Sequence, residues 1–449
     1  MKAGRLLVSS LGALAICTSG NAGTRIVYVS PHGADARPCT RAAPCKSFDR
    51  AYRVARPGDT IRLAGGTYPA QLVRVDVSKV SASRNVVFQP APGATVKIAG
   101  ELTMYGSHAT FLGSGTPSNF RLQKLTSVAT AGKTTSNHVT FANLDGETFT
   151  IGPNYAITIK GGDWGPSVAC HARNSKTKRA TWCPAGSPYA RVGNDGSRGS
   201  YENGIGPDGT IKNQWPHDIL LDGVTIHDQN SLDLTDMHQG GLFIISGYGV
   251  TIRNSKFLRN VVYQIQVQDF TNKTCCGMTF GPLRNVVIEN NWFGQPVTGL
   301  SDPGGDHTDD NQPELQLDPR GGSCWSNWLV RFNSFHNGPA LGFDAEPCFD
   351  RFRMIGNIGA HPGLQCFANA KGLTWSYNAW LGGRCGATDV ALTSLPYVNT
   401  TIGSEDYHLT GGPAQDLVTQ TGGDYALASD IDGHHRPNGP ASDAGASER

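Results

Sequence analysis

The chain has 449 residues, of which 56 are glycine and only 16% are charged, a composition that favours a β protein dense in turns over a helical one. Lys and Arg number 38 and Asp and Glu 36, and the two signs balance once Lys2 and Arg5 of the expected leader are removed. A neutral chain lacks the basic surface that binds nucleic acid, so we expect no nucleic-acid partner.

The first 22 residues have the pattern of a secretory signal peptide. Lys2 and Arg5 precede an apolar run from Leu6 to Cys17, and small residues follow up to Ala22. We therefore expect a secreted, extracellular protein whose mature part spans residues 23–449. No later segment has an apolar run of about 18 residues, so insertion into a membrane is not expected.

Ten of the eleven cysteines remain when Cys17 leaves with the leader. An even number of cysteines in an exported chain indicates disulfides, and zinc is disfavoured because the sequence has no C-x-x-C motif. The pairs close enough in the chain to propose are Cys39 with Cys45, Cys170 with Cys183, and Cys366 with Cys385. The pairing of Cys275, Cys276, Cys324 and Cys348 stays open.

Residues 47–55, with the sequence SFDRAYRVA, predict a short helix near the start of the mature chain. Ser47 suits the N-cap position, and Phe48, Ala51 and Tyr52 fall on one face of the helix. The following RPGDT ends it. A helix at this place would cap the open end of a β structure, whose edge would otherwise invite pairing with another chain.

Six later segments share one pattern, which is an alternating strand, a tight turn and a further apolar residue. They read ILLDGVTI (219–226), VTIRNSKF (250–257), VVIENNWF (286–293), WLVRFNSF (328–335), FRMIGNIG (352–359) and LTWSYNAW (373–380). Asparagine recurs at one position of the turn, as Asn291, Asn333, Asn357 and Asn378. Stacked asparagines can hydrogen-bond from turn to turn and satisfy the backbone groups that a tight bend leaves unpaired.

The spacing of these segments indicates a solenoid. Val330 and Met354 are 24 residues apart and Met354 and Trp375 are 21 apart, while the longest earlier interval is 42. A core coil of this length, with insertions of variable size, predicts a parallel β-helix from about residue 60 to 400. We expect a loop insertion at 165–214 and a closing segment at 400–449.

The segment YVSPHGADARPCTRAAPCKSFDRAYRVARPGDTIRLAGGTY (28–68) resembles the entry segment of secreted bacterial right-handed parallel β-helix proteins, the pectate-lyase-like superfamily. DYHLTGGPAQDL (406–417) and DYALASDIDGHHRPNG (424–439) resemble their closing segment. The resemblance implies an all-β fold, a single right-handed parallel β-helix with a short N-terminal capping helix and long loop insertions. It does not choose a reaction, because the superfamily holds lyases, hydrolases, epimerases and non-catalytic proteins.

The strands that follow the turns predict a polar outward face. When YQIQVQD (263–269), ELQLD (314–318) and LGFDAE (341–346) are aligned, Ile265, Leu315 and Phe343 share an inward column. The outward columns are then Gln264, Glu314 and Gly342; Gln266, Gln316 and Asp344; and Gln268, Asp318 and Glu346. The insertion GGDHTDDNQP (304–313) is expected to form one wall of a groove over this face.

Carboxylates on neighbouring coils, about 4.8 Å apart, repel each other unless a cation, a proton or a basic group compensates their charge. We therefore expect an exposed acidic cluster that binds Ca²⁺ and a row of glutamines that faces a sugar chain. The expected metal ligands are Asp318, Asp344 and Glu346, with Glu314 at the rim. The expected substrate-binding residues are Gln264, Gln266, Gln268 and Gln316.

The favoured function is a polysaccharide lyase that acts on a uronate-containing polysaccharide by calcium-assisted β-elimination, as resembling β-helix lyases do. A basic side chain would take the proton next to the uronate carboxylate. The candidate bases are His238, Lys256, Arg259, His307 and Arg331. One alternative is a glycoside hydrolase or epimerase that uses paired carboxylates in the same groove. Another is a non-catalytic surface or carbohydrate-binding β-helix protein.

Overall fold

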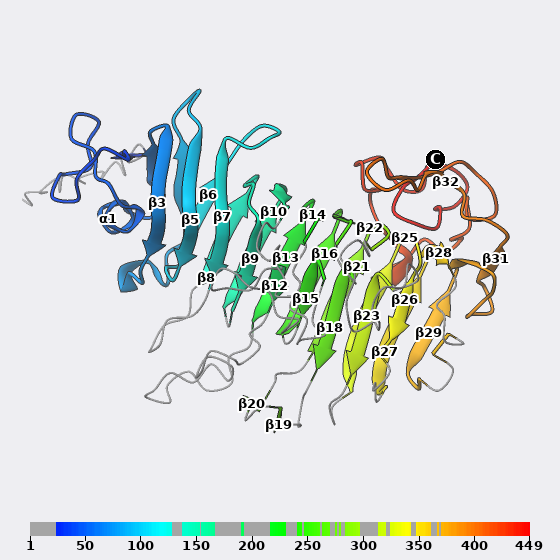
Figure 1. Cartoon of the computed structure of the whole chain (residues 1–449). Helices are drawn as coiled ribbons and strands as arrows, with labels where there is room; N and C mark the ends of the chain where they lie inside the picture. Colours follow the sequence, from blue (N-terminus) through cyan, green and yellow to red (C-terminus); the bar gives the residue numbers. More distant parts are fainter. Residues whose placement is uncertain are drawn as a thin grey trace, which may run out of the picture.

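The computed structural model describes residues 24–127, 137–152, 154–166, 190–192, 216–229, 240–244, 247–260, 263–269, 274–275, 278–279, 283–296, 313–319, 324–342, 347–360, 366–367 and 370–449. Their strands stack into one elongated solenoid, drawn from blue to orange in Figure 1. No helix within these ranges is long and apolar enough to cross a membrane.

Three sheets form the walls of the solenoid. The first sheet contains β1 (Ile26–Val29), β2 (Thr60–Leu63), β4 (Val86–Pro90), β6 (Ala109–Leu112), β8 (Asn137–Ala142), β10 (Tyr155–Lys160), β13 (His217–Asp222), β16 (Gly247–Arg253), β21 (Leu283–Glu289), β24 (Trp325–Arg331), β27 (Phe349–Ile355) and β29 (Leu373–Ser376). The second sheet contains β11 (Asp163–Trp164), β14 (Thr225–His227), β17 (Lys256–Leu258), β22 (Trp292–Phe293), β25 (Ser334–Phe335), β28 (Ile358–Ala360), β30 (Ala379–Leu381) and β31 (Val390–Leu392). The third sheet contains β3 (Gly66–Val73), β5 (Val96–Met104), β7 (Phe120–Ser127), β9 (Thr148–Ile151), β12 (Ala190–Val192), β15 (Leu242–Ile244), β18 (Ile265–Asp269), β23 (Leu315–Pro319) and β26 (Pro339–Leu341).

The predicted parallel β-helix is confirmed by the strand pairing. Neighbouring strands within each sheet run parallel and come from successive coils, as in the pairs β13–β16, β14–β17 and β18–β23. Two expected boundaries are corrected. The first sheet begins at β1, before the helix and well before residue 60. The sequence pattern did not reveal this strand, because β1 is too short to stand out as a repeat. The expected loop insertion at 165–214 contributes β12 to the third sheet.

Aromatic side chains stack inside the solenoid from coil to coil. Phe88, Phe111 and Phe141 have successive ring centroids 4.5 and 5.2 Å apart, and Trp328 lies 5.2 Å from Phe352. These residues occupy equivalent inward positions of neighbouring strands, which are about 4.8 Å apart, so their rings stack face to face. Each such pair contributes about 0.5–1.5 kcal/mol beyond the area that it buries.

The predicted asparagine ladder is also confirmed. The backbone N–H and the side-chain Nδ2 of Asn333 both donate to Oδ1 of Asn357, at 3.1 and 2.9 Å. Asn291 donates in the same way to Asn333, and Asn357 to Asn378. All four side chains are fully buried. The ladder therefore satisfies the backbone of the turn between the first and second sheets in consecutive coils.

Two residues that the asparagine pattern did not reveal extend the ladder. The N–H of Ser255 donates to Oδ1 of Asn291 at 2.9 Å, and the Ser255 hydroxyl accepts from the N–H of Val224 at 3.2 Å. At the other end the N–H of Asn378 donates to Oδ1 of Asp389 at 2.9 Å. The turn needs a buried side-chain acceptor in the next coil, and serine and aspartate can supply one as well as asparagine.

Helix α1 (Phe48–Val54) confirms the predicted N-terminal cap. The side chain of Ser47 accepts from the N–H of Arg50 at 3.1 Å. Phe48, Ala51 and Tyr52 are fully buried, and the ring of Phe48 packs against aromatic rings of the first coils. A short 3₁₀ helix, η1 (Val77–Lys79), follows β3. Helix α1 thus closes the core at the start of the solenoid.

Replacing Ser47 by alanine is expected to lower the free energy of unfolding by about 1 kcal/mol, because the first turn of α1 loses the acceptor for its free N–H. Denaturant titration of the wild type and the variant measures this difference. The matched control is Ser83→Ala, at an exposed serine outside the helix. Equal stabilities of the two variants would contradict the capping role.

Disulfides join segments at both ends of the solenoid. The two expected bonds Cys39–Cys45 and Cys366–Cys385 are present, with Cα atoms 4.6 and 5.3 Å apart. A third bond, Cys324–Cys348, settles one pairing that the sequence left open and lies at the start of the neighbouring strands β24 and β27. The expected pair Cys170–Cys183 and the side chains of Cys275 and Cys276 lie outside the described residues.

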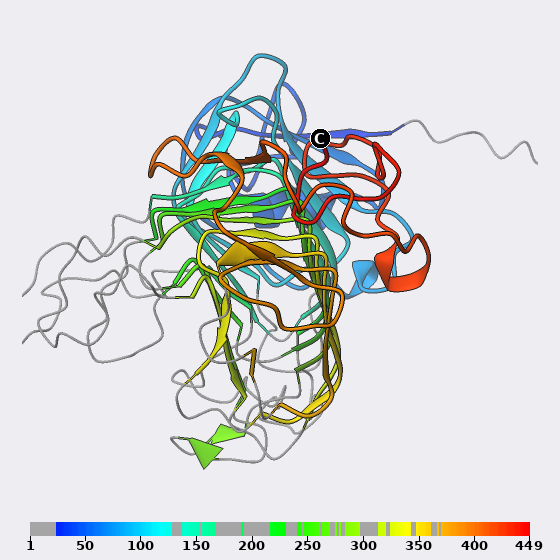
Figure 2. The same cartoon turned by 90° about the vertical axis from the view of Figure 1, so that its right-hand side faces the viewer.

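The closing segment (400–449) folds back over the C-terminal half of the solenoid, where Figures 1 and 2 show it in orange and red. It contains β33 (Asp406–Leu409), which pairs antiparallel with β32 (Tyr397–Asn399), and the 3₁₀ helix η2 (Gly423–Tyr425). Its last residues are buried, and the N–H of Ala446 donates to Oγ of Ser334 on β25 at 3.0 Å. The segment therefore covers the outer side of the second sheet.

A small antiparallel hairpin lies outside the three walls. It consists of β19 (Thr274–Cys275) and β20 (Met278–Thr279), which follow β18 in the chain. The hairpin is part of the long connection between β18 and β21, so it belongs to the side of the solenoid on which the third-sheet strands end (Figure 1).

Candidate functional site

The polar face expected on the third sheet is formed by β18 and β23. These strands pair in parallel with Ile265 opposite Leu315 and Gln268 opposite Asp318. Ile265 and Leu315 belong to the hydrophobic core, so their side chains face inward. The residues that alternate with them along each strand therefore face outward. The predicted facing of this pair of strands is confirmed, and Gln266 lies next to Gln316 in the same outward row.

The alignment of the next strand is corrected. β26 pairs with β23 so that Pro339 lies opposite Leu315 and Leu341 opposite Leu317, and the N–H of Gly342 donates to Leu317 O at 2.7 Å. The expected alignment placed Phe343 beside Leu315, which is wrong by four residues. The strand starts directly after the turn at Asn337 and Gly338, and its proline and glycine hide the alternating pattern.

The shifted alignment changes the neighbours of Asp318. Leu341 lies opposite Leu317, and the next residue, Gly342, lies beside Asp318. A Cβ atom on Gly342 would stand 2.8 Å from Asp318 Oδ1. Asp344 and Glu346, which were expected to stack with the outward glutamines and Asp318, lie outside the described residues. Their role as metal ligands stays a prediction.

The acidic cluster was expected to be exposed, and for Asp318 this is wrong. Gln266, Gln268, Gln316 and Asp318 are each 7% exposed or less. The side chains pack against each other along the sheet, and Nε2 of Gln268 donates to Oδ2 of Asp318 at 3.0 Å. A buried carboxylate needs such a partner, because an unpaired charge in the interior is costly.

The same row carries acceptor oxygens that lack donors. Oε1 of Gln266 and Oε1 of Gln268 are buried and have no hydrogen-bond partner among the described residues. The donation from Gln268 Nε2 to Asp318 fixes which end of that amide is the oxygen. A buried acceptor without a donor costs about 1–3 kcal/mol, so this row is suited to a ligand that brings donors or positive charge.

Ca²⁺ fits this set of atoms. It binds carboxylate and amide oxygens, and the row offers both kinds within two neighbouring strands. Asp318 is the acidic residue that the described part of the row could offer to such an ion, and Gln266 and Gln268 could offer amide oxygens. Because Gly342 has no side chain, Asp318 Oδ1 can approach its backbone closely.

Glu314, expected at the rim of the cluster, is bound elsewhere. It is fully buried, and its carboxylate accepts from the N–H of Asn337 at 2.8 Å and from the N–H of Gly338 at 2.5 Å. Burial raises the pKa of Glu314 well above its ordinary value, although these backbone N–H groups favour the charged form. Glu314 therefore holds the turn before β26 and does not point at the row.

Gln264 is also a structural residue and does not face a groove. Its side chain is fully buried, accepts from Nδ2 of Asn260 at 2.5 Å and donates to Gly294 O at 2.7 Å. It was expected to contact substrate because it precedes Gln266 by two residues on an apparently continuous strand. The strand begins only at Ile265, so Gln264 turns into the corner between two sheets.

Replacing Glu314 by glutamine is expected to remove part of the pH dependence of stability. A carboxyl group whose pKa is raised by folding holds its proton where the unfolded chain, with a pKa of about 4.3, has lost it. The wild type therefore loses stability relative to Glu314→Gln as pH rises from about 4.3 through the raised pKa. Urea titrations over this range measure the difference.

The control for this comparison is Glu101→Gln, at a carboxylate that is 39% exposed. This variant should follow the wild-type stability across the same pH range, because a solvent-exposed carboxylate contributes little to stability. If the difference between the wild type and Glu314→Gln does not change with pH, the raised pKa of Glu314 is refuted.

Two of the candidate bases lie near the second sheet. Lys256 on β17 places its Nζ 3.9 Å from the centre of the Trp292 ring. Arg259, just after β17, binds Asp228 with Nη2 at 2.9 Å and Glu405 of the closing segment with Nη1 at 3.1 Å. Both charged groups already contact other side chains near the second sheet, whereas Asp318 lies on the third sheet.

Arg331, at the end of β24 in the first sheet, is also engaged. Its Nη2 pairs with Oε2 of Glu289 at 2.7 Å, and its Nη1 donates to the carbonyl oxygens of Asp424 and Ala426 at 2.7 and 2.8 Å. It therefore holds the closing segment against the first sheet. The remaining candidate bases, His238 and His307, lie outside the described residues, so their role stays a prediction.

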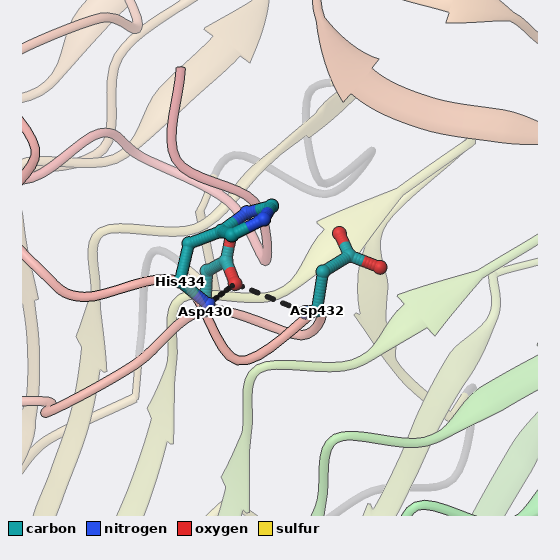
Figure 3. A group of neighbouring side chains, drawn as sticks. All are labelled: Asp430, Asp432 and His434. Carbon is teal, nitrogen blue, oxygen red and sulfur yellow. Dashed lines mark hydrogen bonds and ion pairs between the residues drawn. The ribbon is translucent and has the colours of Figure 1, made fainter.

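A group of acidic and histidine side chains in the closing segment was not expected from the sequence. Asp430, Asp432 and His434 each offer one possible ligand atom within 4.8 Å of the others (Figure 3). Their alternation in DIDGHH was the available signal. The geometry alone would allow a metal ion.

The hydrogen bonds of Asp430 argue against a metal ion at this group. Its Oδ1 accepts from the N–H groups of Asp432 and His434 at 3.0 and 2.7 Å, which are bonds drawn in Figure 3. Its Oδ2 accepts from the N–H of Glu448 at 3.0 Å. Because both oxygens of this buried carboxylate already bind backbone donors, Asp430 organises the loop.

Three solved structures show what the chain is similar to. Pectate lyase Pel9A matches with a TM-score of 0.44 and 14% identity, over 96% of this chain and 98% of that chain. A rhamnogalacturonan lyase matches with a TM-score of 0.40 and 11% identity, over 84% and 91%. The A-module of mannuronan C-5 epimerase AlgE6 from Azotobacter vinelandii matches with a TM-score of 0.30 and 14% identity, over 78% and 97%.

No protein-family model and no curated protein matches the chain. The structural likeness is too distant to carry residue roles from one protein to another. The chemistry of the site therefore rests on the side chains of this chain, above all on the outward row of β18 and β23.

Proposed function

We propose that this chain is a carbohydrate-active protein, a polysaccharide lyase that cleaves a uronate-containing polysaccharide by calcium-assisted β-elimination. The observation that supports it is the row of buried acceptor oxygens at Gln266 and Gln268, beside the Asp318 carboxylate. Sugar hydroxyl groups and a hard cation are the partners that such acceptors accommodate. The disulfides favour an exported protein, because such bonds persist in oxidising compartments.

In this proposal Asp318, Gln266 and Gln268 hold Ca²⁺, and Asp344 and Glu346 remain candidates for further ligands. When bound, the cation supplies positive charge beside the uronate carboxylate, which makes the proton on the adjacent carbon easier to remove. A basic side chain takes that proton, the bond to the leaving glycosidic oxygen breaks, and a carbon–carbon double bond forms.

The base is assigned to one of two histidines. Lys256, Arg259 and Arg331 are bound to other groups on the first and second sheets, as described above. His238 and His307 precede β15 and β23 in the chain, and both strands belong to the third sheet. This position in the chain supports the two histidines as candidates. Replacing each by alanine in turn would show which of them acts as the base.

Elimination is favoured over hydrolysis by the carboxyl groups available. A glycoside hydrolase needs two carboxyl groups that face the scissile bond, about 5–5.5 Å apart for retention or 6.5–9.5 Å for inversion. In the described part of the row Asp318 faces outward, whereas Glu314 is buried against the backbone of the next turn. Elimination needs only charge neutralisation and one base.

The test is to incubate the protein with a panel of uronate polysaccharides in the presence of Ca²⁺ and to follow the ultraviolet absorbance of the conjugated double bond. A rise that chelation abolishes supports the lyase. New reducing ends without this rise identify a hydrolase, and inverted sugar configuration without cleavage, seen by NMR, identifies an epimerase. Binding in a pull-down without any of these changes would identify a non-catalytic binding protein and overturn the proposal.

A further inference from the structure

The closing segment is attached to the second sheet through charged side chains. Arg259, after β17, bridges Asp228 of the solenoid and Glu405 of the closing segment, with contacts of 2.9 and 3.1 Å. The next residue, Asp406, opens β33 and begins a second group of contacts. The residues from 405 to 408 therefore form one of the points at which the closing segment meets the coils.

His408 on β33 lies at the centre of this second group. Its Nδ1 bonds to Oδ1 of Asp406 on the same strand, and its Nε2 bonds to Oδ2 of Asp432 in the following loop at 2.7 Å. The rings of Trp292 on β22 and His408 are nearly perpendicular, with centroids 5.0 Å apart, and Lys256 on β17 lies over the same indole. These are the charged and aromatic groups that face His408 from the described elements around it.

Both ring nitrogens of His408 thus meet carboxylates, and only the protonated ring can donate to both. A neutral imidazole has one N–H, so one of the two carboxylates would then face a nitrogen lone pair. Burial acts to lower the pKa of His408, but the bonds to Asp406 and Asp432 outweigh it and the pKa is raised above its ordinary value.

A second histidine in the same network has the same arrangement. Nε2 of His227 pairs with Asp163 at 3.1 Å and its Nδ1 with Asp228 at 2.6 Å. Burial acts to lower the pKa of His227, and these two carboxylates raise it overall. Asp228 is also the residue that Arg259 binds, so His227 orients the half of the network that belongs to the solenoid.

We propose that the part of the closing segment that packs against Trp292 of the second sheet is held together by a proton-dependent clasp, in which protonated His408 joins Asp406 to Asp432 and loss of this proton loosens the stretches 403–410 and 429–435. The proposal is independent of the reaction that the third sheet carries. It adds a regulatory device that would loosen the cover of Trp292 and Lys256 as pH rises.

The direction of the pH effect follows from the raised pKa of His408. The stabilisation is fully present below the unfolded value of about 6.5 and is lost as pH rises through the higher folded value. Because the side chain of His408 is 38% exposed, solvent screens part of this effect. Salt should weaken the clasp further.

Hydrogen exchange followed by mass spectrometry tests the clasp on the wild-type protein. Peptides that cover 403–410 and 429–435 are compared with peptides from β24 between about pH 5.5 and 8.5, after correction for the intrinsic exchange rate. The protection of the first two peptides is expected to fall by about three- to tenfold across this range, with β24 unchanged. A flat profile in the wild type would overturn the proposal.

Three variants show whether His408 is the titrating group. His408→Gln should remove most of the fall that the wild type shows, leaving only what His227 contributes, and Asp432→Asn should move the fall to lower pH because one carboxylate is removed. His435→Gln, at an exposed histidine in the same loop, should keep the wild-type profile. If His408→Gln or Asp432→Asn falls with the same midpoint as the wild type, another group titrates and the clasp is refuted.

Discussion

Replacing Asn357 by alanine is expected to lower the free energy of unfolding by about 3–6 kcal/mol, because it leaves several buried polar groups without partners. Oδ1 of Asn357 accepts from the backbone N–H and from Nδ2 of Asn333, and its Nδ2 donates to Val330 O at 2.9 Å and to Asn378 Oδ1 at 3.0 Å. All of these groups lie in the interior, where water cannot replace the lost bonds.

Urea denaturation of the wild type and of Asn357→Ala measures this loss. The control is Asn399→Ala in β32, where the asparagine is half-buried and its side chain accepts one N–H, from Thr401, within a local turn. This control should lose less than about 1 kcal/mol. A comparable loss in both variants would mean that the ladder adds nothing beyond an ordinary turn, and a loss confined to Asn357→Ala would establish it.

The ladder was predictable because one residue type repeats at one position of the turn. Asn291, Asn333, Asn357 and Asn378 reveal the coil length before any strand is assigned. Ser255 escaped because a hydroxyl supplies the same acceptor as an amide, so that the chemistry repeats although the residue does not. A search for acceptor side chains at this position would have found it.

The outward face of the third sheet was predictable only where apolar residues alternate with polar ones. This alternation aligned Ile265 with Leu315 correctly. It failed for β26, whose outward positions near Leu341 carry Ala340 and Gly342 and so show no polar partner for Asp318. A four-residue shift keeps the parity of a strand, so each residue stayed on its face but gained the wrong neighbour.

The closing segment was recognisable in the sequence, but its contacts were not predictable. Arg259 and Glu405 are separated by 146 residues, and their pairing follows from how the segment folds back, which no local period encodes. For the same reason Lys256, Arg259 and Arg331 looked available as bases although their partners lie in distant parts of the chain. Burial of Gln268 and Asp318 likewise depends on neighbours that alternation does not reveal.

Replacing Asp318 by asparagine is expected to lower the proposed lyase activity and the proposed stabilisation by Ca²⁺ together. The substitution keeps the shape of the side chain and an acceptor oxygen, but it removes the negative charge that the row of Gln266 and Gln268 surrounds. Loss of a charged ligand is expected to reduce kcat/KM by about 100-fold or more, since the cation supplies several kcal/mol of charge stabilisation. At a Ca²⁺ concentration of about 100 Kd, bound Ca²⁺ adds about 2.7 kcal/mol of stability, and the variant should lose most of it.

Two further variants make this result specific to the site. Gly342→Ala adds a Cβ that would stand 2.8 Å from Asp318 Oδ1 and 2.9 Å from Gln316 Nε2, so it should weaken Ca²⁺ binding without changing any charge. Asp350→Asn, at an exposed carboxylate on β27, should keep both activity and the Ca²⁺ effect. Melting curves with Ca²⁺ and with a chelator, together with initial rates, give both readouts for all three proteins. If Asp318→Asn melts with Ca²⁺ at the wild-type temperature and keeps full activity, the buried row of β18 and β23 is structural and the reacting groups lie elsewhere on the solenoid.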